Sequence, residues 1–257
     1  MTKIPLVLLP GTLCDSELWV YQTAHLSDIA EIQIGDITKS CTIENMAKDV
    51  LDQSPPSFAL AGLSLGGIVA IEIARQAPKR VIKLALMNST ANPPYSHQQE
   101  QWSQLIDEVE KGDFLEVVEK KFLPNLLYKK HSEKKSILLK AKKMAERVGS
   151  QSYLNQLKAV TSKPDGFEVL PALNINTLLI TGSEDILCTA ETNEKMKDFI
   201  PDADLIVIEE CGHLSPMEQP QKVTEEMRKW LLKDRRISKC KNCSCGKKNN
   251  KKGVTNC

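Results

Sequence analysis

The residue with the strongest chemical signal is Ser64, in the segment GLSLGG that starts at Gly62. A serine hydroxyl is a nucleophile only where a base takes its proton and the chain holds it clear of its own strand. A sharp turn from a strand into a helix does the second job, in a strained backbone region that costs about 1–3 kcal/mol. Such a turn brings residues 62 and 66 into contact, and both are glycine. A phosphate-binding turn is the alternative, but the Lys-Ser/Thr pair of a P-loop is missing here.

The chain has four histidines that could act as the general base for this serine. His25 lies in a predicted helix near the N-terminus, and His97 and His131 lie among charged residues in a helical stretch, where we expect surface roles. His213 differs, because its segment CGHLSP directly follows a predicted strand at 205–209. The end of a parallel strand lies at the same sheet edge as Ser64, so His213 is the expected base.

The base needs a carboxylate that fixes its tautomer and stabilises the imidazolium. The segment TGSEDILC supplies Asp185 directly after a predicted strand at 177–182, with Glu184 as a competitor. Either acid could instead be a loop charge or a helix cap. The chain order Ser64, Asp185, His213, with each residue after a strand end, favours Asp185.

Two amide donors for a developing oxyanion complete this chemistry. The N–H of Leu65 lies at the start of the helix that follows Ser64, with the helix dipole behind it. The loop LPGTLCD after the first predicted strand supplies the second donor, the N–H of Thr12, and Gly11 permits the turn.

The elements that must hold these residues alternate between strands and helices. Apolar runs predict strands at 4–10, 31–37, 57–64, 81–88, 176–182 and 204–210, with helical spacing between most of them. Strands that are apolar on both faces indicate a mostly parallel, doubly wound α/β sheet covered by helices on each side. We assign residues 1–91 and 169–233 to this core.

Residues 92–168 interrupt the alternation and are expected to form an all-helical cap. Helical spacing covers 97–111, 113–127, 132–148 and 150–161, with NPP before and KPDG after the stretch. Trp102 and Phe122 of this insertion, with Leu13 and Leu214, are the expected substrate-binding residues. Apolar residues at helical spacing also serve as the internal core of such a cap, and this alternative stays open.

These motifs resemble the α/β-hydrolase superfamily, in its branch with a serine nucleophile and a cap. LPGTLCDSELW resembles the oxyanion loop of that family, GLSLGG its nucleophile elbow, TGSEDILC its acid turn and CGHLSPMEQP its histidine loop, and together they span residues 4 to about 232. The resemblance implies an α/β-hydrolase fold with a cap over the active site. One departure is Pro10, where many relatives have histidine.

The predicted activity is a serine hydrolase that cleaves carboxylic esters or thioesters of small to medium acyl groups through an acyl-enzyme, without a cofactor. A lyase or carbon–carbon bond hydrolase with the same triad is one alternative. A ligand-binding receptor with little turnover is another, because fold alone does not decide function. The expected partner is a small molecule, and the oligomeric state is left open.

The last 25 residues differ in composition from the rest of the chain. Nine Lys or Arg stand there against a single acid, Asp234, so the preceding residues carry a net negative charge. Four cysteines also gather there: Cys240, Cys243, Cys245 and Cys257. A disordered basic tail is favoured for 234–257 because apolar residues are scarce. Four thiolates holding zinc or an iron–sulfur cluster is an alternative, and a nucleic-acid contact is the least favoured one.

The cellular location is predicted to be the cytoplasm. The longest apolar runs, such as IPLVLLP, are far shorter than the roughly 20 residues that cross a bilayer. Four further cysteines are scattered singly, which does not suggest a disulfide framework. We therefore expect neither a membrane partner nor an oxidising compartment.

Overall fold

The computed structural model describes residues 2–131 and 134–233, so the predicted disordered tail at 234–257, with its alternative metal site on four cysteines, lies outside the described residues. Six strands form one sheet in the order β2-β1-β3-β4-β5-β6, and every neighbouring pair is parallel. The strands are β1 (Ile4–Leu9), β2 (Ala30–Ile34), β3 (Phe58–Leu63), β4 (Val81–Met87), β5 (Asn176–Gly182) and β6 (Ala203–Ile208). The predicted parallel α/β sheet is confirmed.

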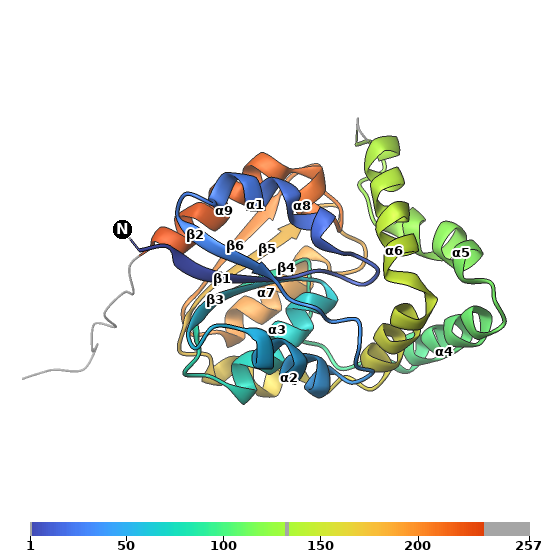
Figure 1. Ribbon diagram of the computed structural model, residues 1–257, viewed down its shortest axis with the longest axis horizontal. Coiled ribbons are helices and arrows are strands. Elements are labelled where there is room, and N and C mark those ends of the chain that lie inside the picture. The colour runs from blue at the N-terminus through green and yellow to red at the C-terminus, as the bar shows by residue number, and fades with distance from the viewer. Residues whose placement is uncertain (1, 132–133, 234–257) are drawn as a thin grey trace, which may run out of the picture.

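Helices cover both faces of the sheet (Figure 1). One face carries α1 (Val20–Leu26), α8 (Ser215–Glu218) and α9 (Pro220–Leu232), and the other carries α2 (Ile43–Gln53), α3 (Leu65–Gln76) and α7 (Ala190–Phe199). Successive residues of a strand point to opposite faces. In β1, Leu6 and Leu8 accordingly join the core beneath α1 and α9, whereas Val7 and Leu9 join the core beneath α2 and α3.

The stretch between β4 and β5 is helical, as predicted. It contains α4 (Ser96–Glu110), α5 (Phe114–Val117) and α6 (Lys134–Thr161). The single helix predicted at 113–127 is instead α5, a π-helical turn at Val118–Phe122 and a 3₁₀ turn at Leu123–Asn125. Pro124 cannot donate the hydrogen bond that an α-helix would need there. The break predicted between 148 and 150 is present inside α6, where Gly149 has a φ of 80°.

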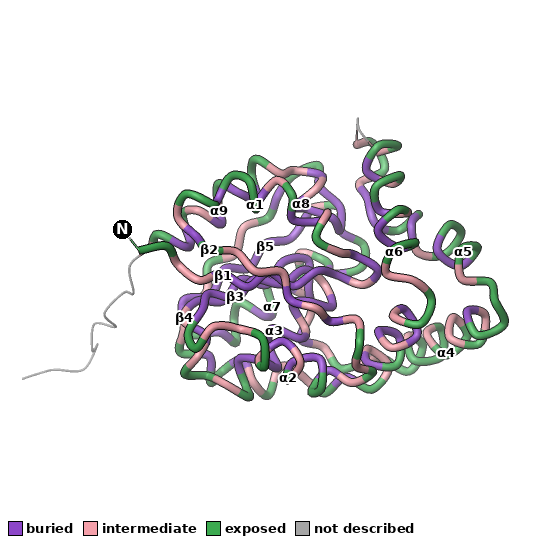
Figure 2. The backbone as a smooth tube through the Cα atoms, viewed as in Figure 1, coloured by how far each residue is buried: buried purple, intermediate pink, exposed green. Residues whose placement is uncertain are grey.

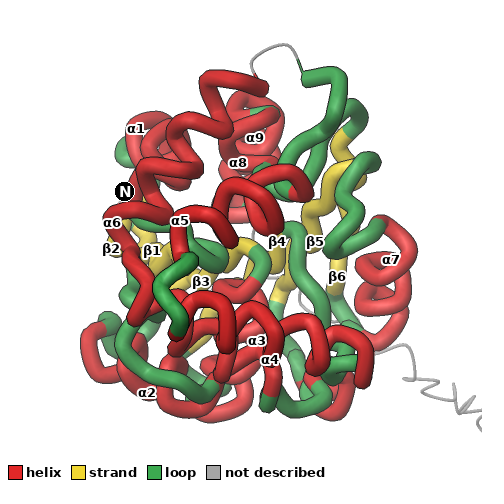
Figure 3. Tube along the Cα trace, turned by 90° about the vertical axis from the view of Figure 1, so that its right-hand side faces the viewer, coloured by secondary structure: helices red, strands yellow, loops and turns green. Residues whose placement is uncertain are grey.

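These cap helices lie across the edge at which the parallel strands end (Figure 3). The inner strands β1, β3, β4 and β5 are mostly buried and the edge strands β2 and β6 only partly so, while α4 and α5 expose much of their length (Figure 2). Loops that follow β1, β3, β4, β5 and β6 all open toward the same space beneath the cap. Among the described residues, we find no helix with the length and apolar character needed to cross a membrane.

Candidate active site

Ser64 lies at the tip of a tight turn between β3 and α3, with a φ of 53° and a ψ of −116°. Left-handed φ values are strained for residues other than glycine and collect at functional sites. The neighbours explain why the chain accepts this strain. A β-carbon on Gly62 would lie 2.2 Å from the main-chain oxygen of Gly66, and one on Gly66 would lie 2.5 Å from the oxygens of Leu9 and Pro10. The predicted contact between residues 62 and 66 is therefore present.

His213 and Asp185 form a buried pair. The Nδ1 of His213 lies 2.8 Å from Oδ2 of Asp185, with side chains 5% and 0% exposed. An ionised carboxylate only accepts hydrogen bonds, so this contact assigns the proton to Nδ1 and leaves Nε2 as an acceptor. Within the described part of the chain, neither Nε2 of His213 nor the hydroxyl of Ser64 has a hydrogen-bond partner, and both residues line the same cavity.

Asp185 is held by more than the histidine. Its Oδ1 accepts from the main-chain N–H groups of Leu187 at 2.9 Å and Cys188 at 3.0 Å, and its Oδ2 also accepts from the Asn88 side chain at 2.9 Å. Burial raises the pKa of Asp185, but the electrostatic interaction with His213 and these hydrogen bonds outweigh it and hold that pKa below its usual value. The carboxylate therefore stays ionised beside the imidazole.

Asn88 was missed by the sequence prediction. It follows β4 at the carboxyl edge, and besides Asp185 it donates to the main-chain oxygen of Gly212 at 3.0 Å. Its Oδ1 accepts from the Ser215 hydroxyl at 2.5 Å. Its place directly after a strand was the available signal, but an asparagine there is also an ordinary loop residue. Asn88 thus ties the acid turn to the histidine loop.

Glu218 holds the loop that contains His213 through hydrogen bonds to its main chain. Its carboxylate, 4% exposed as a residue, accepts from the amides of Tyr128 at 2.8 Å, Gly212 at 3.1 Å and Leu214 at 3.1 Å. Burial raises the pKa of Glu218, and the three amide hydrogen bonds oppose that rise. Because two of the three donors flank His213, this buried acid fixes the position of the imidazole.

The two predicted oxyanion donors are available. The N–H groups of Thr12 and Leu65 donate to no acceptor among the described residues, and both residues line the cavity beside Ser64. The next amide, that of Leu13, donates across to the cap, to Oε1 of Gln156 at 3.0 Å. Leu13 has a φ of 54°, so the turn after β1 is strained and is held by a side chain of α6.

A cavity of about 430 Å³ lies between the strand ends and the cap. This volume is in the range of small-molecule sites. Its walls include, from the core, Gly11, Thr12, Ser64, Leu65, His213 and Leu214, and, from the cap, Trp102, Leu105, Phe122, Tyr153, Gln156 and Leu157. Ser64, His213, Thr12 and Leu65 thus meet at one cavity of mixed apolar and polar lining, and Asp185 lies behind His213 outside that lining.

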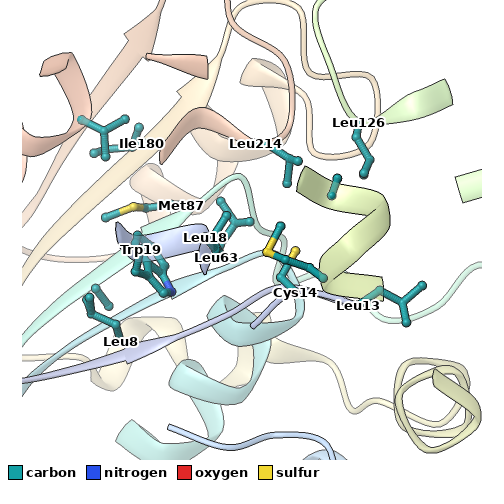
Figure 4. Packing of buried hydrophobic residues seen from close by; sticks show 14 of the residues in the cluster. Leu8, Leu13, Cys14, Leu18, Trp19, Leu63, Met87, Leu126, Ile180 and Leu214 are labelled. Atoms are coloured by element: carbon teal, nitrogen blue, oxygen red, sulfur yellow. The ribbon is translucent and has the colours of Figure 1, made fainter. Parts of the chain in front are cut away.

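Three of the four predicted substrate-binding residues, Trp102, Phe122 and Leu214, line this cavity. The structure places Leu13 elsewhere. Its side chain is 1% exposed, belongs to the hydrophobic core and is not part of the cavity wall formed by the described residues. Figure 4 shows it packed near Cys14 at the edge of this core. Its positive φ turns the side chain away from the site and presents its amide to Gln156.

Cys188 also lies close to the acid and the histidine. The ligand atoms of Asp185, Cys188 and His213 lie within 4.8 Å of one another. A metal would need the thiolate, and burial raises the pKa of the Cys188 thiol well above its usual value. The Nδ1 of His213 and Oδ2 of Asp185 are also engaged with each other. The donor set therefore suits the hydrogen-bonded pair and does not suit a metal ion.

Comparison with known protein families shows which family the chain belongs to. The sequence profile of the alpha/beta hydrolase fold matches residues 38–220. The chain belongs to this family. This confirms the resemblance read from the four motifs.

Known relatives include esterases and a lactonase. The chain is 25% identical over 237 residues to a pimeloyl-[acyl-carrier protein] methyl ester esterase of Pectobacterium atrosepticum, covering 86% of this chain and 92% of the relative. It is 26% identical over 191 residues to 3-oxoadipate enol-lactonase 1 of Acinetobacter baylyi, covering 73% and 70%. A thermophilic esterase from Thermogutta terrifontis superposes with a TM-score of 0.82 at 28% identity, over 90% of each chain. The expected enzyme class, carboxylic ester hydrolase, is the class of these relatives.

Proposed function

We propose that this α/β hydrolase cleaves carboxylic esters or thioesters, with Ser64 as nucleophile, His213 as general base and Asp185 as the acid that orients it. The observation that carries the proposal is the pairing of Asp185 with His213 at 2.8 Å beside a cavity that Ser64 also lines from a strained turn. Kinship with esterases supports it.

The first half of the reaction forms an acyl-enzyme. Oγ of Ser64 attacks the ester carbonyl carbon while Nε2 of His213 takes the hydroxyl proton. The carbonyl oxygen becomes an oxyanion and accepts from the amides of Thr12 and Leu65. The intermediate then expels the alcohol or thiol, which receives the proton from Nε2, and the carbonyl double bond re-forms on Ser64.

The second half releases the acid. Water enters the site, His213 takes one of its protons, and the resulting hydroxide adds to the acyl carbon. Collapse of this intermediate breaks the bond to Oγ of Ser64, which regains its proton from Nε2. Asp185 keeps its negative charge throughout, because four hydrogen bonds stabilise the carboxylate, one of them from the imidazole of His213.

Labelling with a fluorophosphonate tests this assignment. The parent protein should lose activity on 4-nitrophenyl butyrate in proportion to labelling, with the phosphonyl group on the peptide that contains Ser64. Ser64→Ala should abolish labelling and lower kcat by about 10⁶-fold. Ser57→Ala, an exposed serine before β3, is the matched control and should label and turn over like the parent.

The same assay separates the alternatives. Labelling with fast ester turnover supports a hydrolase. Labelling with no turnover of oxygen esters or thioesters contradicts the proposed activity and favours a lyase, a carbon–carbon bond hydrolase or a receptor. A Ser64→Ala protein that hydrolyses esters at the parent rate contradicts the role of the nucleophile.

A further inference from the structure

The charged groups in the cavity wall are unbalanced. Among the described residues, the wall contains two lysines, Lys121 and Lys163, but no aspartate or glutamate. Lys121 is half exposed and pairs with Glu108 at 2.6 Å. Its charge is therefore already compensated. Lys163 remains as the cation of this wall that forms no ion pair among the described residues. It also lines a neighbouring pocket, whose wall contains acids: Glu44, Glu72, Asp165 and Glu168.

Lys163 is buried, with 7% of its surface exposed. Its ammonium group donates to the main-chain oxygen of Asn92. An ammonium group has three donors, and Lys163 has no carboxylate within ion-pair distance in the described part of the chain. A buried cation without an anionic partner is costly unless an anion reaches it. Lys163 thus has unused donors facing a cavity that water or a ligand can enter.

The neighbours of Lys163 do not neutralise it. The groups that affect its charge are the thiol of Cys188 and the carboxylate of Asp165, which is occupied by the amide of Phe167 at 2.9 Å. Burial lowers the pKa of Lys163 to about 8, and these two groups oppose that shift only partly. The amine of Lys163 is therefore mainly protonated at pH 7 and loses its proton as the pH rises past about 8.

The position of Lys163 relates it to the reaction centre. It follows α6, whose residues Gln156, Leu157 and Val160 also line the cavity. Cys188, which interacts with Lys163 electrostatically, has its Sγ within 4.8 Å of the ligand atoms of Asp185 and His213. The ammonium group therefore lies on the acid and histidine side of the same cavity that Ser64 and His213 line.

We propose that Lys163 binds a carboxylate of the substrate, so that the enzyme prefers esters that carry a second, ionised carboxyl group, such as half-esters of short dicarboxylic acids. This inference rests on the proposed function, because it assigns the substrate class of the same site. The ester carbonyl lies at Ser64 and the distal carboxylate accepts from Nζ of Lys163. The absence of acids from the described cavity wall removes the repulsion that would reject such a substrate.

The competing explanation is purely structural. Lys163 would then serve only to hold the main-chain oxygen of Asn92, in the loop after β4. A structural role predicts that loss of the lysine affects neutral and acidic esters by the same factor. A binding role predicts a change in the ratio between them.

A matched pair of substrates measures this ratio. Monomethyl glutarate and methyl 5-oxohexanoate share chain length and ester, and differ in a carboxylate against a methyl ketone. The parent enzyme should have at least tenfold higher kcat/KM for monomethyl glutarate, or for its succinate or adipate homologue. Lys163→Gln keeps a donor for Asn92 but no charge, and should lower this preference at least tenfold. Lys158→Met removes an exposed lysine that pairs with Glu110 and should leave the preference unchanged.

The preference should also depend on pH in a predictable direction. Lys163 is charged below its pKa of about 8, so the preference for the acidic ester should be complete at pH 7 and decline as pH rises past 8. The dependence of kcat/KM reports the free enzyme. A preference that stays level to pH 10, or is the same in Lys163→Gln as in the parent, overturns the inference.

A binding experiment distinguishes failure of this inference from failure of the proposed function. Calorimetric titration of Ser64→Ala with monomethyl glutarate requires no turnover. Binding that weakens at least tenfold in the Ser64→Ala, Lys163→Gln double variant supports the carboxylate site even if the parent hydrolyses no ester. Equal binding in a double variant with an unchanged circular dichroism spectrum overturns the inference, whatever the labelling of Ser64 shows.

Discussion

Replacement of Asp185 by asparagine tests how the acid orders the site. Oδ1 of Asp185 accepts from two main-chain amides, those of Leu187 and Cys188, at 2.9 and 3.0 Å. These donors would hold the carbonyl oxygen of the new amide in the same place. Its NH₂ group must then occupy the position of Oδ2 and face His213, whose Nδ1 now also carries a hydrogen.

Two donors cannot share that contact, so the imidazole must change tautomer. Nδ1 becomes the acceptor and Nε2 carries the proton, which leaves no acceptor for the hydroxyl of Ser64. Loss of the correct tautomer in a serine triad lowers kcat about 10⁴-fold, or about 5 kcal/mol of transition-state stabilisation. Asn88 also loses an acceptor at 2.9 Å, and a buried unpaired donor costs about 1–3 kcal/mol of folding free energy.

The assay is steady-state hydrolysis of 4-nitrophenyl butyrate together with urea unfolding, for Asp185→Asn and for Glu184→Gln. Glu184 is the exposed neighbouring acid and provides the matched control. We expect a large loss of kcat with little change in KM for Asp185→Asn, and parent kinetics for Glu184→Gln. A folded Asp185→Asn protein that retains kcat within tenfold of the parent refutes the reasoning, as does a large loss in Glu184→Gln.

Three further predictions concern the framework of the site. Gly62→Ala places a β-carbon 2.2 Å from the oxygen of Gly66, so the turn must shift, and we expect fluorophosphonate labelling to slow by about 10²-fold; labelling at the parent rate would contradict this. Glu218→Gln takes an acceptor from at least one of three amides and should lower the urea unfolding free energy by about 1–3 kcal/mol, whereas unchanged stability would count against its ordering role. Gln156→Leu leaves the amide of Leu13 without its acceptor and should lower Tm, and an unchanged Tm would contradict the role of Gln156 in holding the loop after β1.

The parts of the fold that the sequence predicts are those encoded locally. A run such as IPLVLL in β1 is apolar on both faces and has one compatible place, in the middle of a covered parallel sheet. The glycines around Ser64 are equally local, because two residues on either side of one turn determine the collision. The place of His213 after a strand end follows from the same rule.

Contacts between segments far apart in the chain could not be predicted from residue type and spacing. Asn88 meets Asp185 across 97 residues of sequence and Gln156 meets Leu13 across 143, and neither residue type indicates such a partner by itself. Burial of Lys163 is also a tertiary property, since a lysine after a helix is exposed in most proteins.

The direction of the Leu13 side chain depends on a φ of 54°, which leucine rarely adopts. The residue type therefore gave no sign that the backbone would place Leu13 in the hydrophobic core. The single helix predicted at 113–127 is also absent, and three short helical segments stand in its place. The apolar residues keep helical spacing there, but Pro124 interrupts the helix. The segment before it contributes Phe122 to the cavity wall.

The most direct test of the central claim is a crystal structure of the protein after reaction with a fluorophosphonate. We predict phosphorus bonded to Oγ of Ser64, with the phosphonyl oxygen within hydrogen-bond distance of the amides of Thr12 and Leu65 and Nε2 of His213 facing the leaving-group position. Phosphorus on another residue, or an adduct on Ser64 whose oxygen contacts neither amide, would contradict it.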